Sequence, residues 1–402
     1  MKSIKEVDLD NKRVILRCDF NVPMSLGKIT DDTKIKKSLK TIEYLISKNC
    51  KIVIMSHLGK IKFESDLEKN SLLPVRDRLS ELLNKDVKFS PKTRGIELDV
   101  MVAELKPGEI ILMENTRFED LPTKLESGND AGLADYWSSF GDIFVMDAFA
   151  SSHRKHASTN GIAKLLPTYY GFLVEEEVKN LDKYIIYPKK PFTVLMGGAK
   201  VDDKLDLIEA MLKKCDYLVL TGGLANTCLR ALGFNVGESL VSLNNEIIER
   251  IKKLLVDYQS KIVLPLDVIV GNTYDSSYVD YKLIDQVSVD DIIGDVGSKT
   301  ISKIEEIVKI SNTIFVNGTV GKYEDMKFAN GTKDLFKILK ESNKTVVIGG
   351  GDTAAAINIL GFSDAFTYVS SGGGATLEYL TLGHMKAFEG IKEDQDYEIL
   401  DI

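Results

Sequence analysis

MGGAKVDDK at residues 196–204 and IGGGDTAAA at 348–356 decide the fold of this 402-residue chain, and VNGTVGKYE at 316–324 lies between them. In each segment an apolar run is followed by glycines, then by a lysine or a carboxylate, and then by a stretch with helical spacing. Glycines let backbone N–H groups approach a phosphate, and the N-terminus of the following helix adds partial positive charge. Three such segments in one half of the chain predict an α/β sheet that binds a polyphosphate.

Short apolar runs and longer stretches with helical spacing alternate along the rest of the chain. The runs are RVILRC (13–18), KIVIMS (51–56), EIILME (109–114), DIFVMDAF (142–149), PFTVLMGG (191–198), YLVLTGG (217–223), KIVLPLDVIV (261–270), NTIFVNG (312–318), TVVIGGG (345–351) and AFTYVSS (365–371). Strands that alternate with helices are typical of parallel sheets with helices on both faces. We therefore predict an α/β fold with two doubly wound parallel-sheet domains, which are Rossmann-like and are joined by a hinge helix.

The chain is long enough for two domains, and a helix near its middle is the expected boundary. TYYGFLVEEEVKNLDKYIIYP at 168–188 reads as an amphipathic helix that ends before two prolines. A helix that bridges two sheets has this pattern, as does an ordinary surface helix, and we favour the bridge. We predict a first domain at 1–168, an interdomain helix at 169–187 and a second domain at 188–385.

Charge and cysteine usage narrow the class of protein. A net charge of −8 argues against a partner such as nucleic acid that is bound by bulk positive charge, although a local basic pocket is compatible with it. The four cysteines show no CxxC spacing, which is typical of reduced thiols in a cytosolic protein. Since no apolar run approaches the ~20 residues of a membrane helix and the N-terminus lacks a signal-like segment, we expect a cytoplasmic location and no membrane partner.

In the first half, polar side chains follow four predicted strands at the point where each strand ends. They are Asp19, Asn21, His57, Arg117 and Arg154. Ligands of parallel sheets lie beyond the carboxyl ends of the strands, and guanidinium groups match carboxylate and phosphate geometry. Any one of these residues alone is better explained as a surface charge on a loop. The set at matching strand ends favours a pocket for a small anion.

In the second half, two lysines and a carboxylate lie next to the glycines. Lys200 follows Gly197 and Gly198, and Lys204 comes one helical turn later, where both can neutralise a polyphosphate. Asp352 is placed to hold the Mg²⁺ that accompanies ATP or ADP. Thr353 opens the next predicted helix, so its hydroxyl contacts phosphate or caps the helix, and the cap is the first expectation.

Other nucleotide chemistries fit less well. The chain has no GxxxxGK[ST] motif, and its GxGxxA run at 349–354 lacks the acidic residue about twenty positions on that a dinucleotide site uses. No serine or cysteine lies in a nucleophile-elbow pattern. Direct in-line phosphoryl transfer is therefore favoured over a covalent enzyme intermediate.

These motifs resemble those of the phosphoglycerate kinase family over nearly the whole chain, in the same order and at the same spacing. The matching segments are RCDFNVP (17–23), SHLG (56–59), LKPGEIILMENTRFED (105–120), DIFVMDAFASSHRKHAS (142–158), GGAKVDDKLDLIE (197–209), FANGT (328–332), IGGGDTAAA (348–356) and SSGGGATLEYL (370–380).

The resemblance implies a glycolytic phosphotransferase with a carboxyl group as acceptor. It would move a phosphoryl group between 1,3-bisphosphoglycerate and ADP, giving 3-phosphoglycerate and ATP, with Mg²⁺ and by direct in-line transfer. It would act as a monomer whose two domains close on a hinge. The tail at 386–402 would return to the first domain, although it is acidic and lacks the family's proline-containing ending.

The resemblance also assigns site residues. It implies that the first domain binds the glycerate through Asp19, Asn21, Lys34, His57, Lys60, Arg117 and Arg154. It implies that the second domain binds nucleotide through Lys200, Lys204, Gly222, Gly223, Asn317, Glu324 (ribose), Gly349, Gly350, Gly351, Asp352 and Thr353, with Asp352 as the metal ligand. Lys34, Lys200, Gly350 and Gly373 would take part in the transfer itself.

Several positions depart from the family pattern. Lys34 stands where the family has an arginine that helps to bind substrate and to stabilise the phosphoryl group in transfer. Thr319 and Val320 replace a proline-methionine pair, and Thr221 replaces a glycine. Because of these changes, two other functions stay possible besides that of an active kinase. One is a catalytically weakened, nucleotide-binding paralogue with a regulatory or interaction role, and the other is a kinase that acts on a different small carboxylate.

Overall fold

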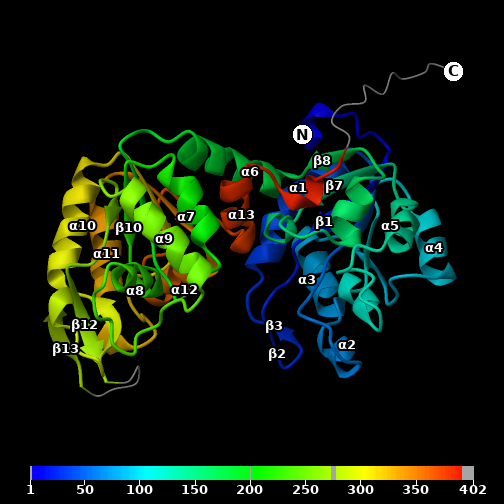
Figure 1. Ribbon diagram of the computed structural model, residues 1–402. Helices are drawn as coiled ribbons and strands as arrows, with labels where there is room; N and C mark the ends of the chain where they lie inside the picture. The colour runs from blue at the N-terminus through cyan, green and yellow to red at the C-terminus, as the bar shows by residue number, and fades with distance from the viewer. Residues whose placement is uncertain (1, 200, 273–277, 392–402) are drawn as a thin grey trace. The chain divides into compact units, whose positions relative to one another are not determined.

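The structure is a computed structural model that describes residues 2–199, 201–272 and 278–391 (Figure 1). Contacts within the chain separate two compact units. The first unit is Met1–Lys179 together with the segment that starts at His384, and the second is Asn180–Gly383. Each unit is built around its own parallel sheet. Among the described residues, no helix has the length and apolar character needed to span a membrane.

The first unit has a six-stranded parallel sheet in the order β5-β6-β4-β1-β7-β8 and a short hairpin formed by β2 and β3. Its strands are β1 (Arg13–Cys18), β2 (Met24–Ser25), β3 (Lys28–Ile29), β4 (Lys51–Met55), β5 (Lys88–Ser90), β6 (Ile110–Met113), β7 (Ile143–Asp147) and β8 (Thr168–Tyr170). Its helices are α1 (Thr33–Ser47), α2 (Ser65–Lys69), α3 (Leu73–Leu83), α4 (Ile96–Ala103), α5 (Ala131–Ser138) and α6 (Phe172–Leu181).

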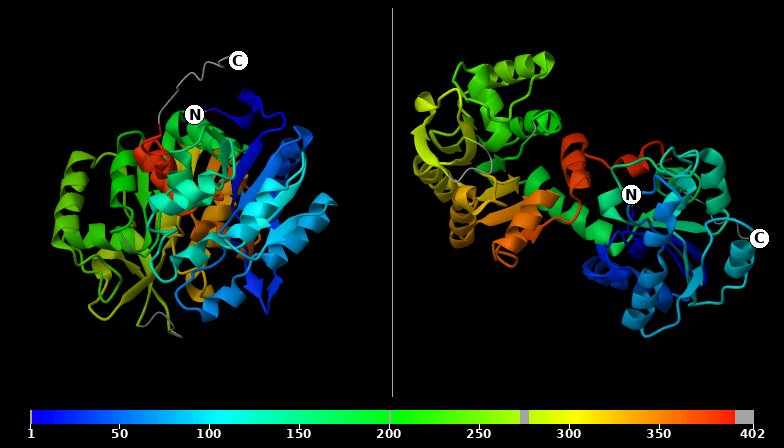
Figure 2. Two further views of the ribbon diagram at one scale, coloured as in Figure 1. Left: turned by 90° about the vertical axis from the view of Figure 1, so that its right-hand side faces the viewer. Right: turned by 90° about the horizontal axis from the view of Figure 1, so that it is seen from below.

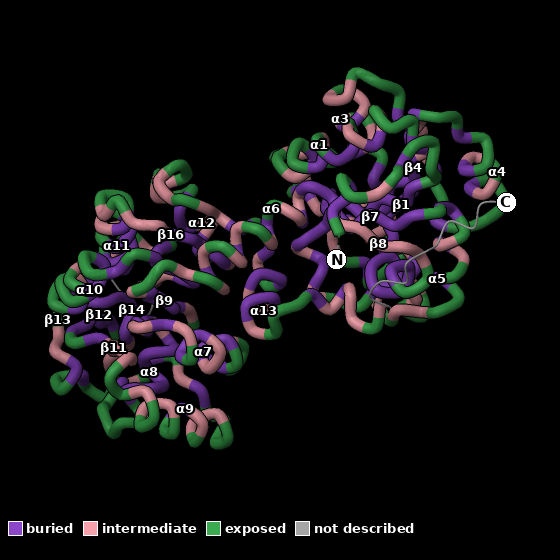
Figure 3. The backbone as a smooth tube through the Cα atoms, turned by 90° about the horizontal axis from the view of Figure 1, so that it is seen from above, coloured by how far each residue is buried: buried purple, intermediate pink, exposed green. Residues whose placement is uncertain are grey.

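Alternate residues of the central strand β1 pack into two different cores. Val14 and Leu16 belong to the layer that also contains Ile42 of α1, whereas Ile15 belongs to the layer around Trp137 of α5. A strand that is buried on both faces reads as a continuous apolar run, which is why RVILRC lacks polar alternation. Figure 3 shows β1, β4 and β7 as buried strands inside this unit.

The second unit has a six-stranded parallel sheet in the order β11-β10-β9-β15-β16-β17. Its strands are β9 (Phe192–Met196), β10 (Tyr217–Leu220), β11 (Ile262–Val263), β12 (Asp267–Gly271), β13 (Asp280–Leu283), β14 (Ile292–Val296), β15 (Thr313–Asn317), β16 (Thr345–Gly349) and β17 (Tyr368–Val369). Its helices are α7 (Leu205–Leu212), α8 (Gly222–Ala231), α9 (Asn245–Asp257), α10 (Ser298–Ile310), α11 (Asn330–Glu341), α12 (Gly351–Ile359) and α13 (Gly374–Leu382) (Figure 2). The two doubly wound α/β sheets that the sequence predicts are confirmed.

One predicted strand is divided between two sheets. The run KIVLPLDVIV forms β11 in the parallel sheet and β12 in a separate three-stranded antiparallel sheet, β13-β12-β14. Pro265 lies between the two strands and cannot donate a ladder hydrogen bond, so a continuous strand through it is disfavoured. The antiparallel sheet was not anticipated from the sequence.

The expected interdomain helix begins later than the sequence suggests. Residues 168–170 form β8, which pairs with β7, and α6 begins at Phe172. Threonine and two tyrosines favour a strand, and Gly171 then packs against Asp147, where an added Cβ would lie 2.2 Å from a carboxylate oxygen. After α6 the chain continues as a π-helical turn, Asp182–Ile186. The boundary between the two units lies between Lys179 and Asn180, inside α6.

The segment after α13 packs within the first unit. The Ala387 N–H donates to Ser152 O at 2.8 Å, and the Asn160 side-chain amide donates to Ala387 O and Glu389 O. The rest of the predicted tail, residues 392–402, lies outside the described residues.

Candidate active site

The carboxyl ends of neighbouring strands place one set of predicted residues together in the first unit. The strands β6, β4, β1 and β7 are adjacent and parallel, so the loops that follow them start at the same edge of the sheet. We call this set the first rim. Its members are Asp19, Asn21, Lys34, His57, Lys60, Arg117 and Arg154.

Asp19 links the end of β1 to the start of α1. The Lys34 Nζ lies 2.9 Å from Asp19 Oδ2 and donates a hydrogen bond to it, while Asp19 Oδ1 accepts from the Asn21 N–H at 3.2 Å. Asn21 in turn accepts the Gly59 N–H at 2.9 Å. The loops after β1 and β4 are therefore joined, and Lys34 is held at the rim with its side chain still 38% exposed.

Positive charge accumulates at this rim. Arg117 is almost buried and donates to Gly59 O at 3.1 Å, and burial together with the like charge of Arg154 lowers its pKa. Arg154 is exposed and donates to the His153 ring. Lys60 is exposed in the loop that carries His57. Guanidinium and ammonium groups gathered without equal negative charge are suited to a small polyanion.

Three buried residues beneath the first rim were not identified from the sequence. They are Arg17, Glu126 and Ser158, and each is fully buried. Arg17 donates to the Ser158 hydroxyl and contacts His57, and Glu126 accepts from Ser158. The sequence gives no signal for this cluster, because Arg17 lies within an apolar strand and the other two are far from it in the chain.

The second unit forms its own set, the second rim, at the carboxyl ends of the neighbouring parallel strands β10, β9, β15, β16 and β17. Its described members are Gly197, Gly198, Lys204, Gly222, Gly223, Asn317, Glu324, Gly349, Gly350, Gly351, Asp352, Thr353 and Gly373. Several of its glycines are sites of close backbone approach. A Cβ at Gly197 would lie 2.0 Å from Thr319 O, and one at Gly223 would lie 2.0 Å from Ala199 O. Gly222 likewise lies against Gly198, where a Cβ would be 2.9 Å from its carbonyl oxygen. No side chain larger than hydrogen fits at these positions without movement of the neighbouring backbone.

Lys204 lies over the glycines that follow β9. Its Nζ donates to Gly197 O at 2.7 Å. Burial lowers its pKa to about 8, against the opposing influence of the Asp352 and Asp203 carboxylates. A buried ammonium group beside these glycines is suited to a phosphate, whose negative charge would favour its protonated form. Lys200 lies outside the described residues.

The loops after β15 and β16 are connected through Asn317 and Thr353. The Asn317 amide donates to Gly349 O at 2.9 Å, and its Oδ1 is buried without a protein partner among the described residues. The Thr353 hydroxyl accepts from the Gly318 N–H at 2.6 Å and lies 3.3 Å from Gly349 O. The expected helix cap by Thr353 is therefore wrong: α12 begins at Gly351, and the hydroxyl connects two strand ends instead.

Helix N-termini at this rim keep their backbone donors uncapped by side chains. No side-chain cap is formed at the start of α8, α12 or α13, whose cap positions are Thr221, Gly350 and Gly373. Gly350 and Gly373 have φ of 97° and 53°, in the left-handed region that favours glycine. Exposed N–H groups at helix starts attract phosphate groups.

The carboxylates of the second rim are exposed at its edge. Asp352 lies in the first turn of α12, and Glu324 is exposed in the loop after β15. Burial raises the pKa of Tyr323, and the negative charges of Glu324 and Asp352 raise it further, so all three groups are neighbours. The described residues contain no group of three metal-ligating side chains. An exposed carboxylate beside a phosphate site fits Mg²⁺, which is commonly held by one or two carboxylates together with substrate phosphates.

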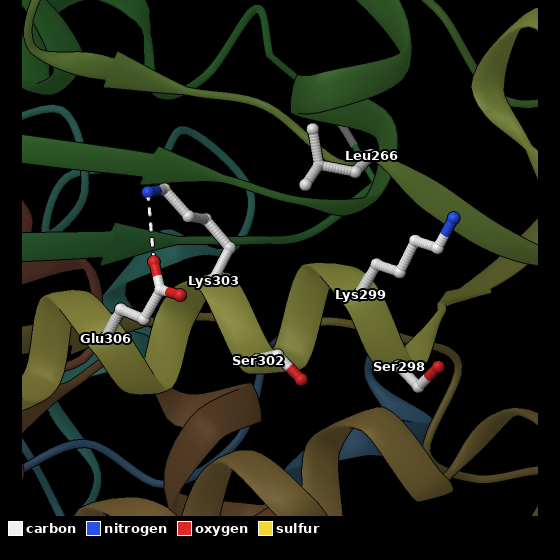
Figure 4. Close-up of a pocket in the computed structure, with 6 residues that line it drawn as sticks. All are labelled: Leu266, Ser298, Lys299, Ser302, Lys303 and Glu306. Carbon is white, nitrogen blue, oxygen red and sulfur yellow. Dashed lines mark hydrogen bonds and ion pairs between the residues drawn. The ribbon is translucent and has the colours of Figure 1, made fainter.

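A shallow surface pocket of about 330 Å³ lies elsewhere on the second unit, along α10 (Figure 4). It is lined by Leu266, Ser298, Lys299, Ser302, Lys303 and Glu306. Lys303 and Glu306 pair with each other at 3.1 Å. None of the residues predicted from the sequence lines it.

Known proteins resemble the chain throughout both units. The family model for phosphoglycerate kinase matches residues 4–382. A phosphoglycerate kinase of Listeria innocua is 45% identical over 381 residues, which cover 94% of this chain and 96% of the relative. One of Macrococcus caseolyticus is 43% identical over 397 residues, covering 98% and 99%. The solved phosphoglycerate kinase structure from Coxiella burnetii aligns with a TM-score of 0.85 at 37% identity and covers 96% of this chain and 97% of its own.

Proposed function

The chain belongs to the phosphoglycerate kinase family, and we propose that its two rims hold the two substrates of that phosphotransfer reaction. The enzyme transfers a phosphoryl group reversibly between 1,3-bisphosphoglycerate and ADP, so its acceptor in the reverse direction is the carboxyl group of 3-phosphoglycerate. The first rim binds the glycerate, and the second rim binds the nucleotide.

At the first rim, cations bind the anionic ends of the glycerate. Positive charge comes from Arg117, Arg154 and Lys60. Neutral hydrogen-bonding groups come from Asn21 and His57. Lys34 is held by Asp19. Its proposed role is to stabilise charge on the phosphoryl group in transfer. Loss of the planar guanidinium at this position removes the bidentate geometry but keeps the charge.

At the second rim, backbone N–H groups carry much of the binding. The glycine runs at 197–198, 222–223 and 349–351 admit the phosphates, and Lys204 compensates their charge. The remaining phosphate contacts come from Lys200, Asn317, Gly373 and Thr353. The ribose of the nucleotide is bound by Glu324.

In-line transfer moves one phosphoryl group without a covalent enzyme intermediate. An oxygen of the glycerate carboxylate attacks the γ-phosphorus of ATP, and the bond from that phosphorus to the β–γ bridging oxygen breaks, leaving the electron pair on ADP. Asp352 would hold Mg²⁺, which when bound neutralises charge on the phosphate oxygens. We further propose that the enzyme is a cytoplasmic monomer that takes small-molecule substrates and binds neither nucleic acid nor membrane.

The observation that supports this assignment is the Lys34–Asp19 pair at 2.9 Å, because it holds a partly exposed ammonium group at the first rim, among the residues proposed to bind the glycerate. A coupled assay of the purified protein with ATP, Mg²⁺ and 3-phosphoglycerate tests it. We expect turnover of the order of 1–10³ per second, the usual range for enzymes. Turnover lower by a factor of about 10² or more with nucleotide still bound would instead support the weakened paralogue, and turnover with another acid alone would identify a different acceptor.

A further inference from the structure

Arg17 is a charged residue whose guanidinium group hydrogen-bonds within the interior of the first unit. It lies on β1 between Met55 of β4 and Met146 of β7, and its side chain is fully buried. Its Nε donates to the Ser158 hydroxyl at 3.0 Å, and its Nη1 donates to Cys18 O at 2.5 Å. Its Nη2 lies 3.1 Å from the Nδ1 of His57. With each nitrogen occupied in this way, Arg17 is not arranged to bind substrate directly.

Glu126 and Ser158 fix the position of this guanidinium. The Ser158 hydroxyl donates to Glu126 Oε1 at 2.5 Å, and the Ser158 N–H donates to Glu126 Oε2 at 2.9 Å. The hydroxyl therefore accepts from Arg17 and donates to Glu126 at the same time. The carboxylate also compensates the buried positive charge of Arg17. A buried charge that is both paired and hydrogen-bonded holds one geometry.

This geometry determines the protonation of His57. Guanidinium nitrogens only donate, so the His57 Nδ1 facing Arg17 must accept and cannot carry a proton. A neutral imidazole then carries its proton on Nε2. Arg17, which contacts the ring, and Arg117, His156 and Lys34 all disfavour a second proton on His57. Burial and these neighbours hold the pKa of His57 well below its usual range.

We propose that Arg17 is a positioning residue that holds His57 as the uncharged Nε2–H tautomer, so that His57 binds the glycerate as a hydrogen-bond donor and not as a cation. His57 is half-buried, and with its Nδ1 against Arg17 the Nε2–H is the polar group of the ring that remains for a ligand. The charge at the rim is then carried by lysine and arginine, whose protonation is constant across neutral pH. The substrate role of His57 in this inference rests on the proposed function.

The wild-type protein provides the first test. With only four histidines in the chain, ¹⁵N-labelled histidine spectra can be assigned by comparison with His57→Gln. We expect the His57 ring to show a protonated Nε2 and an unprotonated Nδ1 from about pH 5 to pH 8, the range in which an ordinary histidine titrates. An Nδ1–H tautomer, or a protonated ring near neutral pH, overturns the proposal without any variant.

Two substitutions then test the role of Arg17. Arg17→Lys keeps the charge but cannot bond Ser158, Cys18 and His57 together, and Ser158→Ala removes the hydroxyl between Arg17 and Glu126. For both we expect some Nδ1–H tautomer to appear and the KM for 3-phosphoglycerate to rise by about tenfold, with the KM for ATP nearly unchanged. Ser90→Ala is the matched control, since Ser90 is a fully buried serine of the same unit whose hydroxyl, among the described residues, hydrogen-bonds the backbone of Lys92.

An unchanged His57 tautomer in both folded variants would show that Arg17 does not set it. Equal loss of affinity for ATP and for 3-phosphoglycerate would indicate a general structural defect and would also reject the positioning role. The spectra need no turnover, so they separate this inference from the proposed function: an active kinase with the other tautomer rejects only the inference. An inactive wild-type protein with the expected tautomer rejects the function and the substrate role of His57, but not the setting of the tautomer by Arg17.

Discussion

Lys34 stands where the family resemblance implies an arginine, and this exchange changes the hydrogen-bonding geometry at the first rim but keeps the positive charge. The ammonium is a point donor, whereas the arginine implied by the family resemblance has a planar fork that binds two oxygens at once. In this chain Asp19 holds the lysine at 2.9 Å, so its position is set even though its donor geometry is simpler. We therefore expect Lys34 to act as a catalytic cation.

Removing this cation tests its contribution. Lys34→Ala should lower kcat by about 10²–10³, the usual cost of losing one transition-state donor, with little change in the KM for ATP. Lys34→Arg should change kcat by less than about tenfold. Steady-state kinetics measure both. Lys36→Ala is the control, because Lys36 lies on the same helix but pairs with Asp32. A Lys34→Ala enzyme as fast as wild type would contradict the assignment.

Lys204 gives a prediction about pH. Its pKa is lowered to about 8 by burial, so the free enzyme loses this positive charge as the pH rises through that value. The kcat/KM for ATP reports the free enzyme, and we expect it to fall above about pH 8. In Lys204→Arg the fall should disappear, because guanidinium stays protonated. A wild-type profile that is flat to about pH 10 would argue against Lys204 as a phosphate contact.

At the scale of single elements, the turn between β16 and α12 depends on one glycine and not on its neighbour. Gly350 has a φ of 97°, and an added Cβ would lie 2.5 Å from the Asn317 amide nitrogen. Nothing lies within 4 Å of the corresponding position at Gly351. The left-handed conformation and the contact with Asn317 therefore act at the same residue.

Alanine substitutions should separate these two glycines. Gly350→Ala should lower the free energy of unfolding by about 1–3 kcal/mol, because it combines backbone strain with a steric contact. Gly351→Ala should leave stability unchanged or raise it by about 0.5–1 kcal/mol, since alanine favours the helix. Scanning calorimetry compares the two proteins. Equal melting temperatures would mean that the turn relaxes freely around the new methyl group.

The start of α6 depends on a buried carboxylate. Asp147 ends β7, and its Oδ1 accepts the Leu173 N–H at 2.9 Å. Burial raises the pKa of Asp147 to about 7, above its value of about 4 in an unfolded chain. A group with a raised pKa stabilises the fold fully below the unfolded value and loses this contribution as the pH rises through the folded value.

Asp147→Asn removes this titration but keeps an acceptor for Leu173. Relative to the variant, wild type should therefore lose about 1–3 kcal/mol of unfolding free energy between about pH 5 and about pH 8. Denaturant unfolding can be followed in this unit alone, because the single tryptophan, Trp137, lies in α5. A difference between the two proteins that is independent of pH would contradict the raised pKa.

For the whole molecule, the proposed function assigns each substrate to one unit. Nucleotide with Mg²⁺ should slow backbone hydrogen exchange at 197–199, 317–324 and 349–353 in the second unit. 3-Phosphoglycerate should slow exchange at 19–21, 57–60 and 117 in the first unit. Bound ligands reduce local opening, and exchange followed by mass spectrometry locates the effect. Sulfate at equal ionic strength is the control, and protection by each ligand in the opposite unit would reverse the assignment.

The sequence by itself determined the two sheets and the edges at which the sites lie. Apolar runs such as RVILRC and TVVIGGG require burial on both faces of a sheet. At several of the glycines that follow such runs, neighbouring backbone lies too close for a side chain. The positions of Asp19, His57 and Asp352 follow from this local order, because a residue that follows a parallel strand must lie at its carboxyl edge. These features depend on neighbours in the chain, so they were predictable.

Only the tertiary structure decided which partners several polar side chains near the strand ends bond. Arg17 and Arg117 both lie near strand ends, yet Arg17 is turned inward to Ser158, which is 141 residues away. Thr353 bonds the loop after β15 and does not cap its own helix. Pro265 divides a run that reads as one strand. In each case the outcome depends on which distant donor or acceptor folding brings within about 3 Å, and hydrogen bonding is too short-ranged for sequence spacing to reveal that partner.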